Sequence, residues 1–323
     1  MIRSRRDVIG PPEGEIVRFK RKLVIAPASI AVVDYGLVLP SLGDDANLEG
    51  MIAAVDLAER HGFTDVWATD HILVDRSAAQ DYGRIYEAVT ALAWAAGRSR
   101  EIRLGASVIV VPMRNAVLLA KQLATLDALS DGRLIAGFGV GWNAAEFANV
   151  GVADRFEVRG AYTEEAINLC RHLWSGSREP FHGRFHTFDD FVFEPLPAQG
   201  ANVPIWVGGR DERALRRAGR LADGFHSSAT SPATYATRIP TIRAAADEAG
   251  SPMPRLSARS RVELDGGAAS FYTMHGSPAD VAAEIRAFAA IGVDHIALAF
   301  PPRDAEGLTR AVERFVAEVL PLV

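Results

Sequence analysis

The sequence predicts an α/β fold, namely a closed (βα)8 barrel with a hairpin or loop insertion before its fifth strand. Short apolar segments alternate with amphipathic segments of helical period from Asp34 onward. The apolar segments are continuous rather than alternating, which is typical of strands buried in a parallel sheet. Eight strand–helix units follow one another between residues 34 and 323, which favours a closed barrel over the alternative, an open doubly wound sheet.

The first four units follow a regular order. Expected strands cover residues 35–40, 64–71, 102–111 and 133–141, and expected helices cover 47–62, 86–99, 116–132 and 160–176. Gly62 and Gly132 end two of these helices, because glycine adopts the left-handed conformation that commonly closes a helix.

The expected insertion comes after the fourth helix. Residues 178–204 are rich in aromatic residues, proline and glycine, which favours a hairpin and a surface loop. The alternation then resumes. Expected strands cover 204–209, 223–228, 256–264 and 293–300, and expected helices cover 211–222, 232–250, 277–292 and 305–323.

Composition narrows the classes of function. The net charge is −5, and 49% of the 323 residues are hydrophobic, which is ample for one large core. No apolar run approaches the roughly 20 residues that span a bilayer. The single cysteine, Cys170, excludes an internal disulfide framework, and its helical context predicts a core thiol. We therefore expect a cytoplasmic protein with a small-molecule substrate that binds neither membranes nor nucleic acid.

The chain is expected to divide near residue 33. Residues 1–33 are expected to form a flexible N-terminal extension, because they contain many basic residues and a segment rich in glycine and proline. Residues 34–323 are expected to form the barrel.

Catalytic residues of such barrels lie at the C-terminal ends of the strands. The second expected strand ends in Asp70 and His71, an acid–imidazole pair in which the imidazole can act as acid, base or hydrogen-bond donor. The alternative is that Asp70 caps a loop and His71 is merely packed. Trp142 either stacks on a ligand or fills the mouth of the barrel. Metal-ligand spacing is absent, so no metal is expected. Five other histidines are expected to be structural or at the surface. They are His182, His186, His226, His275 and His295.

Glycines end two further strands. Gly208 and Gly209 precede Arg210 and a helix, and free N–H groups at a helix start together with an arginine predict a phosphate site. A plain glycine turn is the alternative. Gly139 lies within GFGVG at 137–141, where a glycine lets a flat ligand or a neighbouring chain approach closely.

Four segments in order resemble the luciferase-like monooxygenase superfamily, the bacterial-luciferase-type flavin and deazaflavin enzymes. They are GFTDVWATDH, LAKQLATLDALSDGRLIAGFGVGWNAAEF, PIWVGGRDERALRRAGRLADGF and GSPADVAAEIRAFAAIGVDHIAL. Together they extend over almost the whole expected barrel. The GVGW and RRAGRLADG segments are most similar to the branch that uses the deazaflavin coenzyme F420, with FMN as the alternative cofactor.

The resemblance implies roles for particular residues. Ser107 and Val108 match a non-proline cis peptide bond that forms a bulge behind the coenzyme ring. Asp70 and His71 match the catalytic site on the second strand, Gly139 and Trp142 lie at the ring, and the coenzyme phosphate matches Gly208, Gly209 and Arg210. The resemblance also implies a homodimer.

The sequence departs from the sugar-phosphate dehydrogenases of the superfamily in two respects. They carry a glutamate shortly after the fourth-strand glycines, where this chain has Trp142, Asn143 and Ala144. They also use lysines for the substrate phosphate, and no lysine follows Lys121. The leading hypothesis is therefore an F420-dependent oxidoreductase that moves a hydride to or from another small organic substrate. The alternatives are an FMN-dependent monooxygenase using O2 and a non-catalytic flavin-binding barrel.

Overall fold

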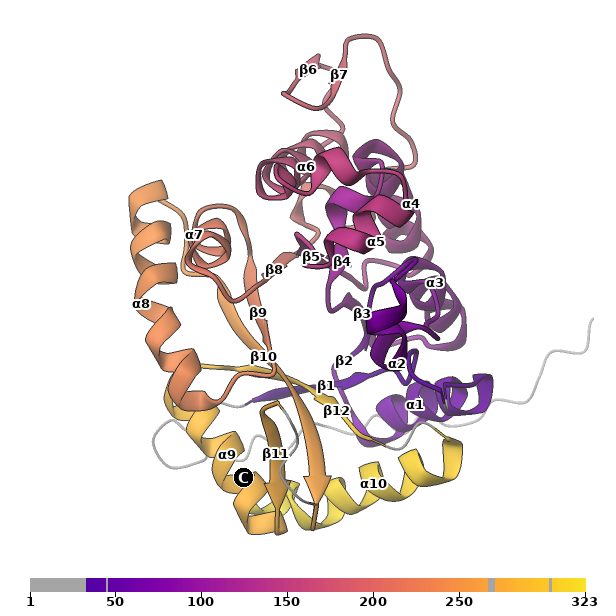
Figure 1. The fold of residues 1–323 in the computed structure, drawn as a ribbon, viewed down its shortest axis with the longest axis vertical. Helices are drawn as coiled ribbons and strands as arrows, with labels where there is room; N and C mark the ends of the chain where they lie inside the picture. The colour runs from indigo at the N-terminus through magenta and orange to yellow at the C-terminus, as the bar shows by residue number, and fades with distance from the viewer. Residues whose placement is uncertain (1–32, 45, 267–270, 302–303) are drawn as a thin grey trace, which may run out of the picture. The chain divides into compact units, whose positions relative to one another are not determined.

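The computed structural model describes residues 33–44, 46–266, 271–301 and 304–323. Eight parallel strands close into a barrel, and the last of them pairs with the first (Figure 1). This confirms the predicted (βα)8 barrel. The barrel strands are β1 (Asp34–Val38), β2 (Asp65–Ala68), β3 (Arg103–Ala106), β5 (Leu134–Gly139), β8 (Ile205–Gly208), β9 (Gly224–Ser228), β10 (Arg255–Leu264) and β12 (His295–Ala299).

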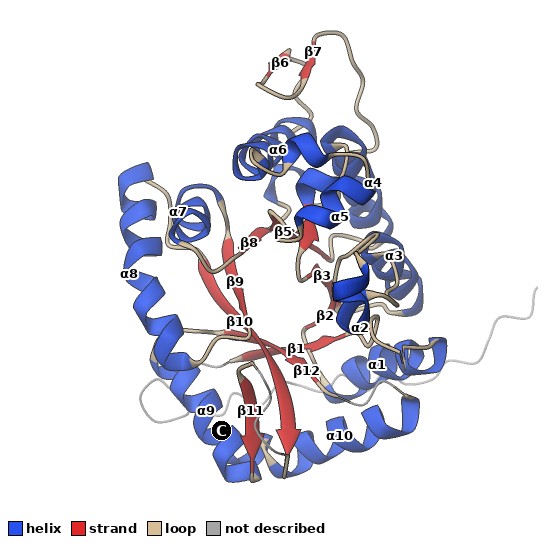
Figure 2. Ribbon diagram, viewed as in Figure 1, coloured by secondary structure: helices blue, strands red, loops and turns tan. Residues whose placement is uncertain are grey.

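A helix follows each barrel strand and packs on the outside of the barrel (Figure 2). These helices are α1 (Leu48–His61), α3 (Ala88–Arg98), α4 (Ala116–Leu129), α6 (Arg159–Trp174), α7 (Glu212–Leu221), α8 (Pro232–Ala249), α9 (Pro278–Ala290) and α10 (Ala305–Glu318). Shorter elements lie in the loops. They are α2 (Ala79–Tyr82), α5 (Ala144–Asn149) and the 3-10 turns Arg76–Ala78, Val111–Met113, Ala153–Arg155, Gly200–Asn202 and Leu320–Leu322.

Polar side chains explain where several helices begin. The Asn47 side chain accepts the Gly50 N–H at the start of α1, and Gly62 ends that helix with a φ of 73°. Glu87 likewise accepts the N–H groups of Val89 and Thr90, so α3 begins two residues later than the expected 86–99. The amphipathic pattern locates each helix, and the capping side chains set its first residue.

The core has two parts. Between the strands and the outer helices lies a large apolar layer that includes Cys170 and Trp174, both fully buried. The Cys170 thiol is therefore a core group as predicted, and burial raises its pKa. The interior of the barrel is different, because Trp67 and Trp206 fill it beside buried histidines.

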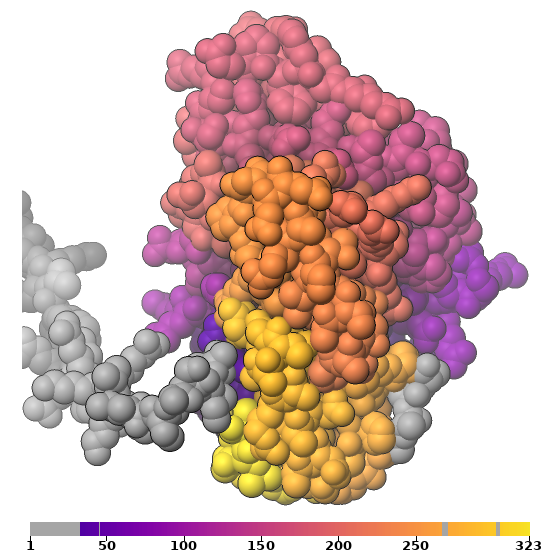
Figure 3. All heavy atoms as spheres, turned by 90° about the vertical axis from the view of Figure 1, so that its left-hand side faces the viewer, coloured from indigo at the N-terminus to yellow at the C-terminus, as the bar shows by residue number. Residues whose placement is uncertain are grey.

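The predicted insertion is an antiparallel hairpin of β6 (Phe181–His182) and β7 (Thr187–Phe188), which projects beyond α6 (Figure 1). The Glu165 carboxylate on α6 anchors it by accepting the backbone N–H groups of Phe185 and His186. A half-buried carboxylate with several N–H donors holds a loop firmly in place. Figure 3 shows this side of the molecule, where α8 and the helices next to it face the viewer below the hairpin.

The seventh barrel strand differs from the prediction. The strand β11 (Thr273–Gly276) pairs in parallel with Arg261–Leu264 at the end of β10, outside the closed barrel. The sequence analysis placed no strand between the expected strand at 256–264 and the expected helix at 277–292. Because β10 extends past its barrel neighbours, its last backbone groups need a further partner, and β11 supplies it.

Two predictions concern the remainder of the chain. The expected flexible extension, residues 1–33, lies outside the described residues except for Val33. In the part of the chain that the structure describes, no helix combines the length and apolar character needed to cross a membrane.

Candidate active site

A bulge in the third barrel position shapes the mouth. The strand β4 (Ile109–Val110) continues β3 along β5, but the four steps from Gly105 to Ile109 face only three steps from Ile135 to Phe138. One extra residue is therefore accommodated, as in a β-bulge. The Ser107–Val108 peptide bond within it is cis, as the resemblance implied.

Two of the predicted glycines make room for this bulge. A Cβ atom on Gly139 would lie 2.4 Å from Cγ2 of Val108, and one on Gly208 would lie 3.0 Å from Cγ1. The Val108 side chain thus sits between the ends of β5 and β8. The structure therefore brings Val108, Gly139 and Gly208 together as one packing unit.

His71 forms a buried pair that the sequence analysis did not foresee. Its Nδ1 atom lies 2.8 Å from Oε2 of Glu146, and Oε1 of the same carboxylate accepts the Ile72 N–H at 2.6 Å. Burial acts to raise the pKa of Glu146, but the hydrogen bonds from His71 and Ile72 outweigh it and lower that pKa. Glu146 is therefore ionised at neutral pH, and Nδ1 of His71 must carry the proton that they share.

The second nitrogen of this imidazole is available. Over the residues that the structure describes, no group hydrogen-bonds to Nε2 of His71. The ring packs against Tyr82 of α2 at 4.2 Å between centroids and against Trp142 at 6.0 Å. Trp142 is 60% exposed, so its indole offers a surface on which a planar ring can stack.

Asp70 has a different setting from its neighbour. Its Oδ2 atom accepts the Val110 N–H at 2.8 Å, and Oδ1 lies 2.6 Å from Nη2 of Arg114, which also pairs with Glu87. Burial raises the pKa of Asp70, and the contact with Arg114 partly offsets this rise. Both carboxylate oxygens thus have hydrogen-bond partners. The bond from Val110 to Oδ2 links the end of β2 to the bulge.

The loop after β8 contains the expected anion-site residues. Gly209 has a φ of 152°, and a Cβ there would lie 2.3 Å from Cβ of Ala214. Arg210 donates to the Ser228 carbonyl at 3.3 Å and is otherwise exposed. Asp211 caps α7 by accepting the Ala214 N–H, so one N–H of that helix start is already satisfied.

Two hydroxyls near the mouth have no partner. Ser41 Oγ follows β1 and Thr69 Oγ1 follows β2, and both are buried without a hydrogen bond among the described residues. Buried polar groups are normally satisfied, so such groups indicate a missing polar ligand or water. Together with His71, Trp142 and the Gly209–Arg210 loop, they fit a planar polar ring with an anionic side chain.

The sequence matches a known family model. The model for luciferase-like monooxygenases covers residues 31–263. The chain belongs to the luciferase-like monooxygenase family.

Curated relatives within this family carry two kinds of name. An F420-dependent glucose-6-phosphate dehydrogenase of Nakamurella multipartita is 32% identical over 203 residues, which are 62% of this chain and 58% of that protein. The chain thus matches little more than half the length of this relative. An uncharacterized protein of Mycobacterium tuberculosis is 29% identical over 304 residues, 88% of this chain and 98% of that protein.

Solved structures share the fold of this luciferase-like chain. The coenzyme F420 dependent tetrahydromethanopterin reductase from Methanopyrus kandleri matches with a TM-score of 0.74 and 20% identity, over 90% of this chain and 99% of that one. The oxygenating constituent of 3,6-diketocamphane monooxygenase from Pseudomonas putida, in complex with FMN, gives 0.75 and 17% over the same shares. Identities this low establish the fold alone.

One residue of this luciferase-like site was missed by the sequence analysis. Trp142, Asn143 and Ala144 do follow the fourth-strand glycines, and Glu146 comes two positions after them. The structure brings Glu146 to His71, because Asn143 caps α5 and this short helix turns Glu146 toward β2. The signal in the sequence was the segment NAAEF. Asn143 can cap a helix, and the residue three positions after such a cap, here Glu146, then lies on the inner face of the first helical turn.

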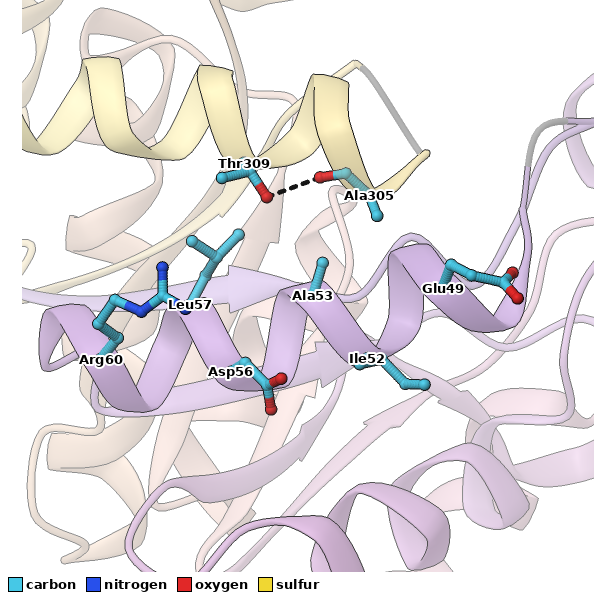
Figure 4. A pocket seen from close by; sticks show the side chains of 8 residues that line it. All are labelled: Glu49, Ile52, Ala53, Asp56, Leu57, Arg60, Ala305 and Thr309. Atoms are coloured by element: carbon cyan, nitrogen blue, oxygen red, sulfur yellow. Dashed lines mark hydrogen bonds between the residues drawn. The ribbon is translucent and has the colours of Figure 1, made fainter.

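A pocket elsewhere in the described part of the chain is a weaker candidate. The pocket in Figure 4 lies between α1 and α10 on the outer layer, where the Thr309 hydroxyl donates to Ala305 O. Two of its charged lining residues are already paired, Asp56 with Arg98 and Arg60 with Glu313. Among the described residues, no group of three or more His, Cys, Asp or Glu side chains is placed to hold a metal ion.

Proposed function

We propose that the protein is an F420-dependent oxidoreductase that transfers a hydride between the deazaflavin and a small, uncharged organic substrate. The names of the matched dehydrogenases support the choice of coenzyme. The observation that carries the proposal is the buried His71–Glu146 pair at the C-terminal end of β2, with Nε2 of His71 open to a ligand. Removing a hydride from an alcohol also requires removal of the hydroxyl proton, and this pair is suited to accept it.

Glu146 determines what His71 can do. The ionised carboxylate holds the proton on Nδ1, so Nε2 carries the lone pair that accepts a substrate proton. The resulting imidazolium is stabilised by the same carboxylate. In the reverse direction Nε2 donates that proton to a carbonyl oxygen. His71 is thus the proposed catalytic residue, and Glu146 the residue that positions it.

Several other residues are proposed to hold the coenzyme, which supplies the hydride chemistry when bound. The bulge at Ser107–Val108 would support one face of the ring, and Trp142 would cover the mouth beside it. Gly209 and Arg210 would contact the phosphate. We propose that Asp70 acts at a distance, because its oxygens hold Val110 and Arg114 rather than facing a ligand.

The substrate is proposed to be other than a sugar phosphate, although the names of several relatives include glucose 6-phosphate. Lys121 is the one lysine among the described residues, and its ammonium contacts Glu194 O and the Phe193 ring on the outer surface. No lysine of the described chain therefore faces the mouth. Tyr82 and Trp142 instead line it with aromatic surface, which favours an apolar or aromatic substrate.

A substrate screen tests this proposal. Purified protein with oxidised F420 is offered secondary alcohols, aromatic alcohols and glucose 6-phosphate, and loss of the oxidised-coenzyme absorbance is followed. We expect turnover of an uncharged alcohol, and we expect His71→Ala to lower kcat by roughly 100-fold or more while coenzyme affinity is kept. Equal turnover by His71→Ala and wild type would contradict the catalytic role. Turnover of glucose 6-phosphate alone would contradict the substrate class.

A further inference from the structure

A continuous chain of hydrogen bonds crosses the inside of the barrel, separate from the His71–Glu146 pair. Five side chains form it, one each from β2, β9, β10 and β12 and one from the bulge between β3 and β4. The links are Asp65 Oδ1 to His295 Nε2 at 2.8 Å, His295 Nδ1 to Ser257 Oγ at 2.7 Å, Ser257 Oγ to His226 Nδ1 at 2.7 Å, and His226 Nε2 to Ser107 Oγ at 2.8 Å. We call these five residues the barrel relay.

The barrel relay is shielded from water along its length. Asp65, Ser257 and His295 are fully buried, and Ser107 is the most exposed member at 7%. Trp67 stacks on the His226 ring, with 4.6 Å between the ring centroids. Two buried histidines joined through one serine are costly unless every polar atom is paired, and here each of them is.

One end of the relay has a fixed charge. Burial acts to raise the pKa of Asp65, but His295, Arg103 and the Trp67 N–H lower it well below its usual range. The Trp67 indole can only donate, so Asp65 must accept from it at 2.5 Å. Asp65 is therefore a carboxylate, and Nε2 of His295 must carry a proton toward it.

The remaining bonds then have a single direction when both imidazoles are neutral. Nδ1 of His295 accepts from the Ser257 hydroxyl, which in turn accepts from Nδ1–H of His226. Nε2 of His226 accepts from the Ser107 hydroxyl, whose oxygen accepts from Nη1 of Arg259 at 3.2 Å. Each hydroxyl has one proton, so no other arrangement satisfies every link.

One added proton reverses this order. If His295 takes it, Nδ1 of His295 donates to Ser257, Ser257 donates to His226, and Nε2–H of His226 donates to Ser107. If His226 takes it, Nε2 of His226 again becomes a donor. In both cases Nε2 of His226 no longer accepts the Ser107 hydroxyl proton, so the Ser107 O–H can point into the mouth of the barrel.

We propose that the barrel relay exchanges one proton with the coenzyme ring through Ser107. This inference rests on the proposed function, which puts the ring against the Ser107–Val108 bulge. Reduction of a deazaflavin adds one hydride and one proton to the ring. In the proposed function, His71 takes the proton lost by the substrate hydroxyl. The proton added to the ring must therefore come from another group, and Ser107 at the end of the relay lies at the bulge that would hold the ring.

The exchange balances along the chain. Ser107 Oγ gives its proton to the ring and receives one from Nε2 of His226. Nδ1 of His226 then takes the Ser257 hydroxyl proton, and Ser257 takes the Nδ1 proton of His295. The net result is one proton gained by the ring and one lost from the His295 imidazolium. Oxidation of the ring runs the same transfers backwards.

Charged groups at both ends of the barrel relay affect how readily it takes up the added proton. Arg259 lies beside Ser107 and, with burial and His295, lowers the pKa of His226, whereas Asp65 raises it. Arg103 pairs with Asp65 at 3.0 Å from the opposite end of the barrel. Arg255 lies over the Trp206 ring but is paired with Asp34 and Asp294. The two ends of the relay thus differ in charge: a carboxylate contacts His295, and a guanidinium lies on the Ser107 side of His226.

The first test uses ligand-free protein labelled with 15N-histidine, followed by NMR between about pH 5 and pH 9. We expect the imidazole shifts of His226 and His295 to change together with one apparent midpoint, because the two rings share one proton. Ser257→Ala should uncouple them. Ser260→Ala is the matched control, since Ser260 is a buried serine of the same strand that donates to Arg261 O.

Independent titration of the two rings in the wild type, or no change in either, would overturn the proposal. Ser257→Thr keeps the hydroxyl and should keep the two histidines coupled. This variant shows whether the effect of Ser257→Ala comes from the lost hydroxyl or from a defect in folding.

The second test adds the coenzyme. Reducing bound F420 should shift the His226 signals in the wild type and in Ser260→Ala, but not in Ser257→Ala. The single-turnover hydride transfer rate should fall about tenfold in Ser257→Ala and stay within about twofold in Ser257→Thr. Equal behaviour of the Ser257→Ala and Ser260→Ala proteins would overturn the relay while leaving the oxidoreductase proposal intact. Failure of wild-type protein to bind F420 would overturn the proposed function and the link to the ring, even with coupled histidines.

Discussion

At the scale of single residues, the chemistry of the site depends on which atoms of a side chain already have a hydrogen-bond partner. His71 and His186 both pair with a glutamate, at 2.8 and 2.9 Å, yet they differ in setting. His186 belongs to the hairpin, where Glu165 also holds backbone N–H groups. His71 lies at a strand end in the barrel mouth with Nε2 open. Geometry rather than residue type thus separates the proposed catalytic pair from an anchoring one.

The variant Glu146→Gln tests this distinction. The amide no longer requires a proton on Nδ1, so His71 loses its fixed tautomer, and we expect kcat/KM to fall about 100-fold. Steady-state kinetics with the alcohol found in the screen would measure it. Glu165→Gln is the matched control. It should lower thermal stability by loosening the hairpin while kcat/KM per folded molecule stays within about twofold of wild type.

Asp65 gives a pH-dependent contribution to stability. Because its pKa is lower in the folded protein, its stabilisation is complete above the unfolded-state pKa of about 3.9 and is lost as the pH falls through the folded-state value. We expect Asp65→Asn to lower the free energy of unfolding by about 3 kcal/mol at neutral pH, since it breaks a buried pair. Urea denaturation should show this difference shrinking in acid.

The exposed residue Asp56 provides the comparison for that experiment. It pairs with Arg98 at the surface, so Asp56→Asn should change the free energy of unfolding by less than about 1 kcal/mol. A loss for Asp65→Asn that grows as the pH is lowered would contradict an ionised, stabilising Asp65.

At the scale of elements, the bulge between β3 and β4 depends on glycines in neighbouring strands. Gly139→Ala would force a Cβ against Val108, and we expect a loss of about 2 kcal/mol in the free energy of unfolding. Adding Val108→Ala should restore part of it. Gly97→Ala, in α3 with open space around it, should be neutral or slightly stabilising. No recovery in the double variant would show that the packing of Val108 is not the cause.

Regular elements were predictable from the sequence, and the connections carrying the site were less so. The buried strands and long helices were located because hydrophobic period reports burial directly. The helix α5 escaped prediction because six residues are too few to show a period, and Glu146 escaped with it. The strand β11 was missed for a related reason, since its pairing depends on the length of β10.

At the scale of the whole molecule, barrel closure brings distant parts of the chain together. Asp65 and His295 are 230 residues apart and share a hydrogen bond. Sequence reasoning treated His226 and His295 as structural because no local spacing joins them. Their relation becomes visible only where β10 pairs with β9 and with β12, which sets Ser257 opposite both histidines. Family resemblance, by contrast, located Ser107–Val108 in advance, because the motif is contiguous.

The central claim, a deazaflavin site at the C-terminal mouth of the barrel, is tested most directly by a binding titration. Oxidised F420 and FMN are titrated separately into the purified wild-type protein, with Trp142→Ala in parallel, and fluorescence is followed. We predict that F420 binds at least about tenfold more tightly than FMN and that Trp142→Ala weakens F420 binding. Tighter binding of FMN would place the protein in the oxygen-activating branch. Binding of neither would contradict the site itself.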